Sequence, residues 1–447
     1  EHFYVLSEPI ADIDRSLPVL RDYNNCLYLK EDAGKLLVGV FEPNAKPAFT
    51  NNYKVPDDFS FGELPEDFDH FEPYLINAMN RVPSLEQSGI RKFFNGPESF
   101  TPDTQYLLGE TPEIKKLFTC CGFNSIGIAS SGGAGRVTAE WMINGYMNED
   151  LYSLDIKRFQ KFHSSKKFIM NRVTETLGDL YGMHWPYKQH KTSRDQKLLP
   201  YHDELKKAGA CFGQSGEYER PMWFALDGTK PEYEYSFNYQ NWYPSTEYES
   251  KNTIKNVGLF ELSPFSKYEI KGDKVHEELQ RLCTANIKNE IGKCTYTHML
   301  NEGAGIETDL TVVCLEKNCF RIISSAAVRT HDKAHILKHL SKDLEFKDVT
   351  DELICLGIFG PKSRDLLSKI TQDDLSNENF KFSTSKNIKL NSINVWAQRL
   401  SYVGELGYEL YVDFKNAKKI YELIINKGKD FNLSNCGMHA MDIMRME

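Results

Sequence analysis

The chain contains 447 residues with a formal net charge of -9, and its 26% charged and 40% hydrophobic residues are ordinary values for globular domains. This length is enough for two or three domains with cores of their own. The acidic balance argues against a nucleic-acid partner, because phosphate neutralisation needs clustered Lys and Arg. No apolar run reaches the roughly 18 residues of a membrane-spanning helix, so we expect no membrane insertion.

Cysteine usage indicates the redox environment. Ten cysteines are spread along the chain, and the adjacent Cys120 and Cys121 have neither the spacing of a metal site nor the geometry of an ordinary disulfide. We therefore expect reduced thiols, a reducing compartment and no metal centre. The chain begins with Glu1 instead of Met and stops at Glu447 without a helix C-cap, so we expect that both ends of a longer protein are missing.

The first part of the chain alternates strand and helix signals. Short apolar segments separated by turn residues occupy Glu1 to Val40, which predicts strands. Residues 68–87 carry apolar side chains at steps of three and four, which predicts a helix. An antiparallel sheet beside a helix is the economical arrangement, and it indicates an α+β (mixed α/β) fold.

A glycine-rich stretch, GFNSIGIASSGGAGR, follows a predicted strand that ends at Gly122. We expect a turn over this stretch and then a helix that begins near Gly135, with Ala139, Met142 and Ile143 on its apolar face. The N-terminus of such a helix would offer N–H groups to a phosphate or an electron-rich ring. The alternative is that the glycines only let a helix pack close to a strand. The stretch lacks the GxGxxG spacing of a dinucleotide-binding fingerprint.

The segments EHFYVLSEPI, FNGPESFTPDTQYLLGE and GFNSIGIASSGGAGRVTAEWMINGY resemble the second half of the flavin domain in the sarcosine and dimethylglycine dehydrogenase family. The resemblance is nearly continuous from Glu1 to about Phe162, and it implies part of a D-amino-acid-oxidase-like FAD and substrate domain over residues 1–143. The unit that binds the FAD pyrophosphate would then precede Glu1, so we expect this chain alone to hold FAD weakly. The residues that the resemblance places at the flavin and substrate cavity are Pro102, Gly122, Phe123, Asn124, Ser125, Gly127 and Ile128.

Residues 144–200 are expected to be a connecting central segment of the FAD oxidoreductase. The segment contains a predicted helix, KFIMNRVTETLGDLYG, and a polar run, KQHKTSRDQK, which includes His190 and Lys191. Such a run could bind an anion, but we expect a solvated linker.

The most informative stretch of the remaining chain is Thr295 to Val313, TYTHMLNEGAGIETDLTVV. Asn301 and the glycines that follow it are turn residues, and apolar residues from Leu310 onward begin a strand. This pattern predicts that Asp309 lies at a loop-to-strand junction, where a carboxylate can meet a ligand. The alternative is an acidic turn residue that caps a hairpin.

Residues 201–447 resemble the aminomethyltransferase family, the glycine-cleavage T-protein, because MLNEGAGIETDLTVV is similar to that family's tetrahydrofolate-binding motif. The resemblance implies a T-protein-like folate-binding domain in which Asp309 is the catalytic residue and acts on the folate nitrogens. Asn301 and Tyr296 are further expected folate-binding residues.

A second group of expected folate-binding residues lies near the end of the chain. Glu405 stands between two glycines and matches the family's Gly-Glu-x-Gly position, so the resemblance implies that it pairs with the amino-pyrimidine edge of the pterin. Arg445 matches an arginine that closes the folate site. The alternative for Arg445 is an ion pair with Glu447 or Asp442 on one helix.

Together the two resemblances imply an enzyme in which FAD oxidises an N-methyl amine and tetrahydrofolate receives the one-carbon unit. The expected partners are a small N-methyl amine, of the sarcosine or dimethylglycine type, and an electron acceptor, either electron-transfer flavoprotein or oxygen. The expected location is the cytoplasm of a bacterium or the mitochondrial matrix. Two alternatives stay open: a non-catalytic homologue of the pyruvate dehydrogenase phosphatase regulatory subunit type, and a plain aminomethyltransferase.

Overall fold

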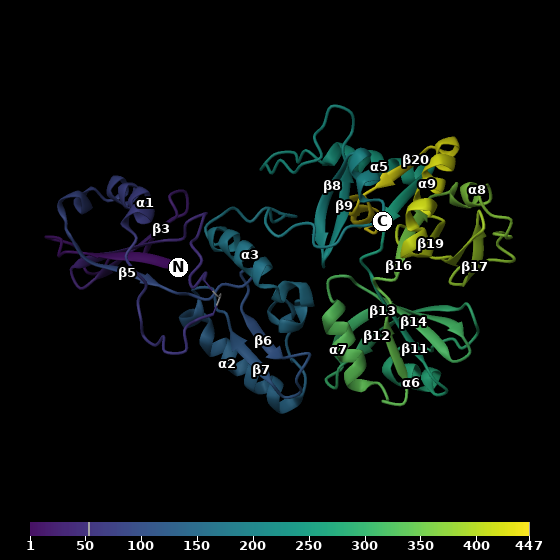
Figure 1. The fold of residues 1–447 in the computed structure, drawn as a ribbon, viewed down its shortest axis with the longest axis horizontal. Coiled ribbons are helices and arrows are strands. Elements are labelled where there is room, and N and C mark those ends of the chain that lie inside the picture. Colours follow the sequence, from purple (N-terminus) through teal and green to yellow (C-terminus); the bar gives the residue numbers. More distant parts are fainter. Residues whose placement is uncertain (52–53, 447) are drawn as a thin grey trace. The chain divides into compact units, whose positions relative to one another are not determined.

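The computed structural model describes residues 1–51 and 54–446. Contacts divide the chain into two compact units, Glu1–Arg194 and Asp195–Glu447, and each is described by itself (Figure 1). Both units combine helices with mainly antiparallel sheets, so the α+β class predicted from the sequence is confirmed. Among the described residues, none of the helices has the length and apolar character needed to cross a bilayer.

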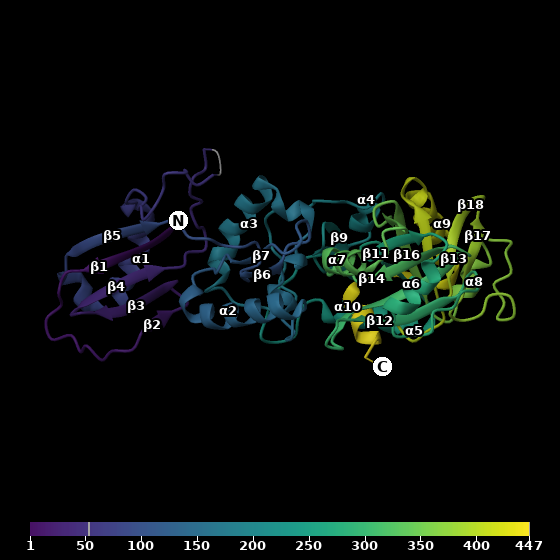
Figure 2. The ribbon, with the colours of Figure 1, turned by 90° about the horizontal axis from the view of Figure 1, so that it is seen from below.

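Unit 1 is built on an antiparallel sheet with the strand order β2-β3-β4-β1-β5. Alternate residues of β1 point to opposite faces, and Phe3 and Val5 enter the core together with Phe71 of α1, which packs on one face of the sheet (Figures 1 and 2). A separate hairpin pairs β6 with β7. The elements are β1 (His2–Ser7), β2 (Leu20–Asp22), β3 (Leu27–Asp32), β4 (Lys35–Val40), α1 (Phe68–Arg81), β5 (Ile90–Gly96), β6 (Leu107–Glu110), β7 (Phe118–Cys121), α2 (Gly127–Asn144) and α3 (Lys166–Asp179).

The glycine-rich stretch of unit 1 differs from the sequence-based expectation. Helix α2 begins at Gly127, so the Ser and Gly residues that were expected to form a turn lie inside the helix. Its packed face carries Val137 and Trp141, whereas the expected apolar residues Met142 and Ile143 are exposed. Helix α2 therefore forms over this stretch despite the low helix propensity of glycine.

Unit 2 contains two larger sheets, ordered β17-β18-β19-β16-β10-β20 and β12-β13-β14-β11-β15, beside a β8-β9 hairpin. Helices α5 and α9 pack near the first sheet, and α6 and α7 pack on the second (Figure 1). The strands are β8 (Ala210–Ser215), β9 (Tyr218–Phe224), β10 (Val257–Glu261), β11 (Ser266–Lys271), β12 (Cys294–Leu300), β13 (Ile306–Glu316), β14 (Cys319–Ser324), β15 (Glu345–Asp348), β16 (Leu353–Phe359), β17 (Ser385–Leu390), β18 (Ile393–Gln398), β19 (Gly407–Asp413) and β20 (Leu433–Cys436). The helices are α4 (His202–Lys207), α5 (Tyr243–Lys255), α6 (Val275–Leu282), α7 (Arg329–His339), α8 (Ser363–Leu367), α9 (Ala417–Gly428) and α10 (Met438–Met444).

Each of the two sheets buries one face in its own core. On β19 the residues of this core are Tyr408, Leu410 and Val412, while Tyr411 belongs to a second buried cluster on the other face, and on β13 the core residues include Leu310 and Val312. Because successive side chains of a strand point to opposite faces, the intervening residues of both strands are directed away from these cores. This alternation decides which residues are available to bind a ligand.

Candidate functional site

A cavity of about 580 Å³ lies in unit 2, and strands of both sheets, the β8-β9 hairpin and α10 contribute to its wall. A cavity of this size is in the range that binds a small organic ligand or cofactor. The polar and aromatic residues in its wall are Ser215, Arg220, Phe265, Tyr296, Asp309, Thr311, Ser324, Ser325, Phe382, Ser401, Tyr402, Glu409, Tyr411, Asp442 and Arg445.

Tyr296 and Asp309 form the first polar pair in the cavity. In the antiparallel ladder Asp309 lies opposite His298, and Thr311 lies opposite Tyr296, so Tyr296 and Asp309 are diagonal neighbours on one face. The Tyr296 hydroxyl donates to Asp309 Oδ2 at 3.0 Å, and burial together with this hydrogen bond raises the pKa of the Tyr296 phenol. Asp309 is the fourth residue of β13 and not a junction residue, and its exposed side chain faces the cavity.

Glu409 and Tyr411 form the second polar pair. Both residues are on β19, on the face opposite the core residues Tyr408 and Leu410. The Tyr411 hydroxyl donates to Glu409 Oε2 at 2.8 Å. Burial raises the pKa of the Glu409 carboxyl, and the hydrogen bond from Tyr411 partly offsets that rise. A ligand with further N–H donors would therefore stabilise the ionised form of this carboxyl.

Arg445 is an exposed residue at the cavity, and its guanidinium carbon lies 4.3 Å from the centre of the Tyr402 ring. A guanidinium over an aromatic face is held by a cation–π interaction. In the part of the chain that the structure describes, Arg445 makes no ion pair with Asp442, while Glu447 lies outside the described residues. The guanidinium can therefore reach an anionic ligand group.

The sequence assigned the ring-holding role to Glu405, but the described wall of the cavity contains Glu409 instead. Glu405 lies in the turn before β19, next to Gly404, whose φ of 80° is in the left-handed region. The signal that could have identified Glu409 is the alternation in GYELYV, where every second residue enters the core. The match to the Gly-Glu-x-Gly pattern pointed to Glu405 instead.

Asn301 is also outside the cavity wall, and its side chain organises the β12-β13 turn. Its Oδ1 accepts from the backbone N–H groups of Gly303 and Gly305, and its Nδ2 donates to Glu307 at 2.8 Å. Glu307 Oε2 in turn lies 3.0 Å from Nε2 of His331, on α7. Burial alone would raise the pKa of Glu307, but the hydrogen bonds from His331 and Asn301 lower it to about 2. Asn301 thus supports the hairpin that carries Asp309.

In unit 1 the residues expected near the flavin lie around the β7-α2 junction. Asn124 is buried, and it accepts from the backbone N–H of Thr101 at 2.8 Å while donating to the Gly122 carbonyl at 2.7 Å. The Phe123 ring stacks on Tyr106 at 4.9 Å. These contacts hold the backbone in place, and the side-chain oxygen and nitrogen of Asn124 both bond to backbone groups of the protein.

Unit 1 contains a cavity whose wall residue Glu98 is hydrogen-bonded by Ser125, one of the residues expected near the flavin. The cavity has a volume of about 490 Å³, and its wall includes Glu98 and Phe100 of the PESFTPD segment as well as Lys166 and Met170 of α3. The described wall does not include Pro102, Gly122, Phe123, Asn124, Ser125, Gly127 or Ile128. Ser125 and Ile128 are exposed.

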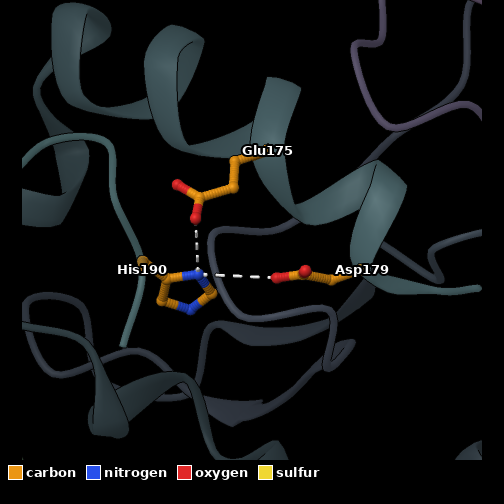
Figure 3. Close-up of side chains that lie close together, drawn as sticks. All are labelled: Glu175, Asp179 and His190. Atoms are coloured by element: carbon orange, nitrogen blue, oxygen red, sulfur yellow. Dashed lines mark ion pairs between the residues drawn. The ribbon is translucent and has the colours of Figure 1, made fainter. Parts of the chain in front are cut away.

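A cluster of Glu175, Asp179 and His190 has the residue types of a metal site, and Figure 3 shows both carboxylates of α3 directed toward the His190 ring. His190 Nδ1 lies 3.8 Å from Glu175 and 3.6 Å from Asp179. Glu175 also accepts hydrogen bonds from the backbone N–H groups of Lys191 and Thr192, and Asp179 pairs with Lys188 at 2.5 Å. Ion pairs and hydrogen bonds of this cluster thus hold residues 188–192 against α3. The polar run KQHKTSRDQK is therefore not the solvated linker that was expected from the sequence.

Three family models match consecutive parts of the chain. A model of the FAD dependent oxidoreductase matches residues 1–141, the FAD dependent oxidoreductase central domain matches residues 144–198, and the GCVT N-terminal domain matches residues 201–447.

Curated relatives match the chain over its whole length. A 4-methylaminobutanoate oxidase (formaldehyde-forming) of Paenarthrobacter nicotinovorans is 38% identical over 449 residues, which cover 100% of this chain and 54% of the relative. The mitochondrial pyruvate dehydrogenase phosphatase regulatory subunit of Mus musculus is 32% identical, and the mitochondrial sarcosine dehydrogenase of Mus musculus is 33% identical; each match covers 100% of this chain and 52% of the relative. The chain spans about half the length of the curated relatives that it matches. The chain belongs to the GCVT N-terminal domain family, whose model covers more than half of it, and the residues before that domain match the models of the FAD dependent oxidoreductase and its central domain.

Proposed function

We propose that the protein oxidises an N-methyl amino acid with FAD and transfers the one-carbon unit to tetrahydrofolate, which binds in the cavity of unit 2. The relatives named for 4-methylaminobutanoate and sarcosine act on amines that carry a carboxylate, which supports this substrate class. The observation that carries the proposal is that two carboxylates, each hydrogen-bonded by a tyrosine, lie in the wall of one cavity: Asp309 with Tyr296, and Glu409 with Tyr411.

Glu409 is suited to hold the pterin ring. An amino-pyrimidine edge presents two neighbouring N–H donors, and a carboxylate accepts such a pair in bidentate geometry. The ring would replace the water that burial removes from Glu409, and its donors would favour the carboxylate form. Arg445, which is exposed beside Tyr402, is suited to pair with the carboxylates of the glutamate tail.

Asp309 is suited to move a proton at the folate nitrogens. When bound, tetrahydrofolate would supply two N–H nitrogens, and each would form a C–N bond to the carbon of an iminium. The C=N bond of the iminium would break, and the two protons lost by the folate nitrogens would end on the departing amine. Asp309 would accept the proton of the attacking nitrogen and return it to that amine as a general base and then a general acid. Tyr296 orients the carboxylate through its 3.0 Å hydrogen bond.

The regulatory relative favours a second possibility, a protein of the same domain order without catalysis. The carboxylates that the chemistry needs, Asp309 and Glu409, are both present in this chain, and both face the cavity. This observation supports the enzyme over the regulator.

The test is a comparison of two neighbouring carboxylates by anaerobic calorimetric titration with tetrahydrofolate. Glu409→Gln should weaken binding by about 1–3 kcal/mol, or about 5- to 150-fold, the cost of losing a charge-assisted pair. Glu405→Gln is the matched control and should bind as tightly as the wild type. Equal affinity of Glu409→Gln and wild type, or an equal loss in both variants, would contradict the assignment.

A further inference from the structure

Arg220 is a charged residue in the wall of the unit 2 cavity for which the proposed function has no role. It lies on β9, its side chain is mostly buried, and its Nε is buried without a hydrogen-bond partner. Among the described residues, the Arg220 side chain has neither a hydrogen-bond partner nor an ion-pair partner within 4 Å, although its backbone belongs to the β8-β9 ladder.

Two other arginines of unit 2 that are buried or partly buried provide the comparison. Arg321 pairs with Glu269 at 2.6 Å, and Arg329 pairs with Asp348 at 3.1 Å. An arginine taken out of water normally needs such a partner, because an unpaired buried charge costs several kcal/mol. Arg220 therefore has the unused hydrogen-bonding capacity that a ligand anion would satisfy.

The charges around Arg220 do not replace such a ligand. Asp442 and Glu261 act on it at longer range, and burial lowers the pKa of its guanidinium to about 10, which leaves it charged at neutral pH. Asp442 lies in the same cavity wall, where burial raises the pKa of its carboxyl and Arg220 and Arg445 act in the opposite direction.

The two arginines of the cavity differ in exposure. Arg445 is exposed, which suits a long ligand tail that continues into solvent. Arg220 is mostly buried, and its planar fork matches a carboxylate in bidentate geometry. A small carboxylate inside the cavity fits this position better than a tail that must reach solvent.

We propose that Arg220 binds the carboxylate of the amino acid that carries the one-carbon unit, and so holds that amino acid in the cavity together with tetrahydrofolate. The inference rests on the proposed function, because it takes the one-carbon donor of that reaction as the ligand. It assigns Arg220 a role in choosing amines that carry a carboxylate over amines that lack one.

The experiment titrates the protein with glycine and 4-aminobutanoate, the demethylated forms of such substrates, and follows binding by calorimetry or ligand-observed NMR without turnover. Glycinamide, which keeps the amine and lacks the carboxylate, is the ligand control. Arg220→Gln should weaken binding of the better-binding amino acid at least about 10-fold, because the charge-assisted pair is lost. Arg220→Lys should keep part of the affinity. Arg281→Gln, at an exposed arginine paired with Glu278, is the matched control and should bind as the wild type does.

Three outcomes would overturn the inference: no carboxylate-dependent binding by the wild type, equal binding by wild type and Arg220→Gln, or a loss confined to tetrahydrofolate. The last result would assign Arg220 to the folate tail. Thermal unfolding by circular dichroism checks that Arg220→Gln stays folded. Failure of wild-type tetrahydrofolate binding would instead contradict the proposed function, so the two failures are distinguishable.

Discussion

Residues of the unit 2 strands and of the glycine-rich stretch of unit 1 were both expected from the sequence to bind ligands. The two groups differ in whether their side chains face a cavity in the structure. In unit 2 the side chains of Asp309 and Glu409 come from two sheets and face one cavity. In unit 1 several of the expected residues lie at the start of α2. There Ile128 is exposed, and the Asn124 side chain donates a hydrogen bond to the backbone carbonyl of Gly122.

The difference teaches that the two kinds of motif carry different information. A strand motif fixes the direction of each side chain through alternation, so one known core residue decides which neighbours face the ligand. A glycine-rich motif leaves the backbone conformation open, and packing at a distance decides it. The predictions below test each side of this comparison.

The largest effect is expected at Asp309 in a preparation that oxidises its N-methyl substrate. Asp309→Asn should lower formation of methylene-tetrahydrofolate by about 10²- to 10⁴-fold, the usual contribution of a general acid–base group. Reduction of the flavin by the amine should persist, and formaldehyde should appear as the unused one-carbon product. Product analysis by chromatography measures both compounds. Loss of flavin reduction in a folded variant would place Asp309 in the oxidation chemistry and contradict its role here.

The packed face of α2 predicts the next effect. Trp141 is 6% exposed, and its ring occupies the space where a side chain at Gly109 would lie. Trp141→Ala should therefore lower the free energy of unfolding of unit 1 by about 3–5 kcal/mol. Met142→Ala, one residue further and 58% exposed, should change it by less than about 0.5 kcal/mol.

Chemical denaturation of the two variants measures this contrast. If Met142→Ala is the more damaging substitution, the face expected from the sequence is the packed one, and the helix orientation described here is wrong.

A smaller effect concerns acid stability of the hairpin that carries Asp309. The folded-state pKa of Glu307 is about 2, below its ordinary value of 4.5, so its contribution is complete above about pH 4.5 and is lost as the pH falls toward 2. This contribution should be about 2–3 kcal/mol. Denaturation of unit 2 at pH 7 and pH 3 should show a smaller loss in Glu307→Gln than in the wild type. An identical pH dependence in both proteins would remove Glu307 from the acid response.

The sequence predicted the fold class and the turn at Asn301 followed by a strand because their signals are local, but it placed Asp309 at the loop-to-strand junction, whereas the strand begins at Ile306. Alternation in β13 and a turn residue at Asn301 are both readable over a few positions. Glu409 could have been found in the same way, since Tyr408 and Leu410 enter the core on either side of it.

Other features have no local signal. Arg220 is recognisable only once α10 and both sheets surround it, because its lack of a partner is a property of the tertiary structure. The start of α2 at Gly127 has no local signal either, because the Ser and Gly residues of its first turns have low helix propensity.

The alternation of β19 has a consequence for how the cavity forms. A shift of this strand by one residue would send Glu409 into the hydrophobic core and turn Tyr408 out of it, so the shifted register is strongly disfavoured. The core contacts that stabilise the native register of β19 therefore also determine on which face Glu409 lies. The carboxylate needs no separate rearrangement to reach the cavity. Partly folded forms of unit 2 should then be binding-incompetent, and the loss of ligand affinity along a denaturant series should coincide with global unfolding.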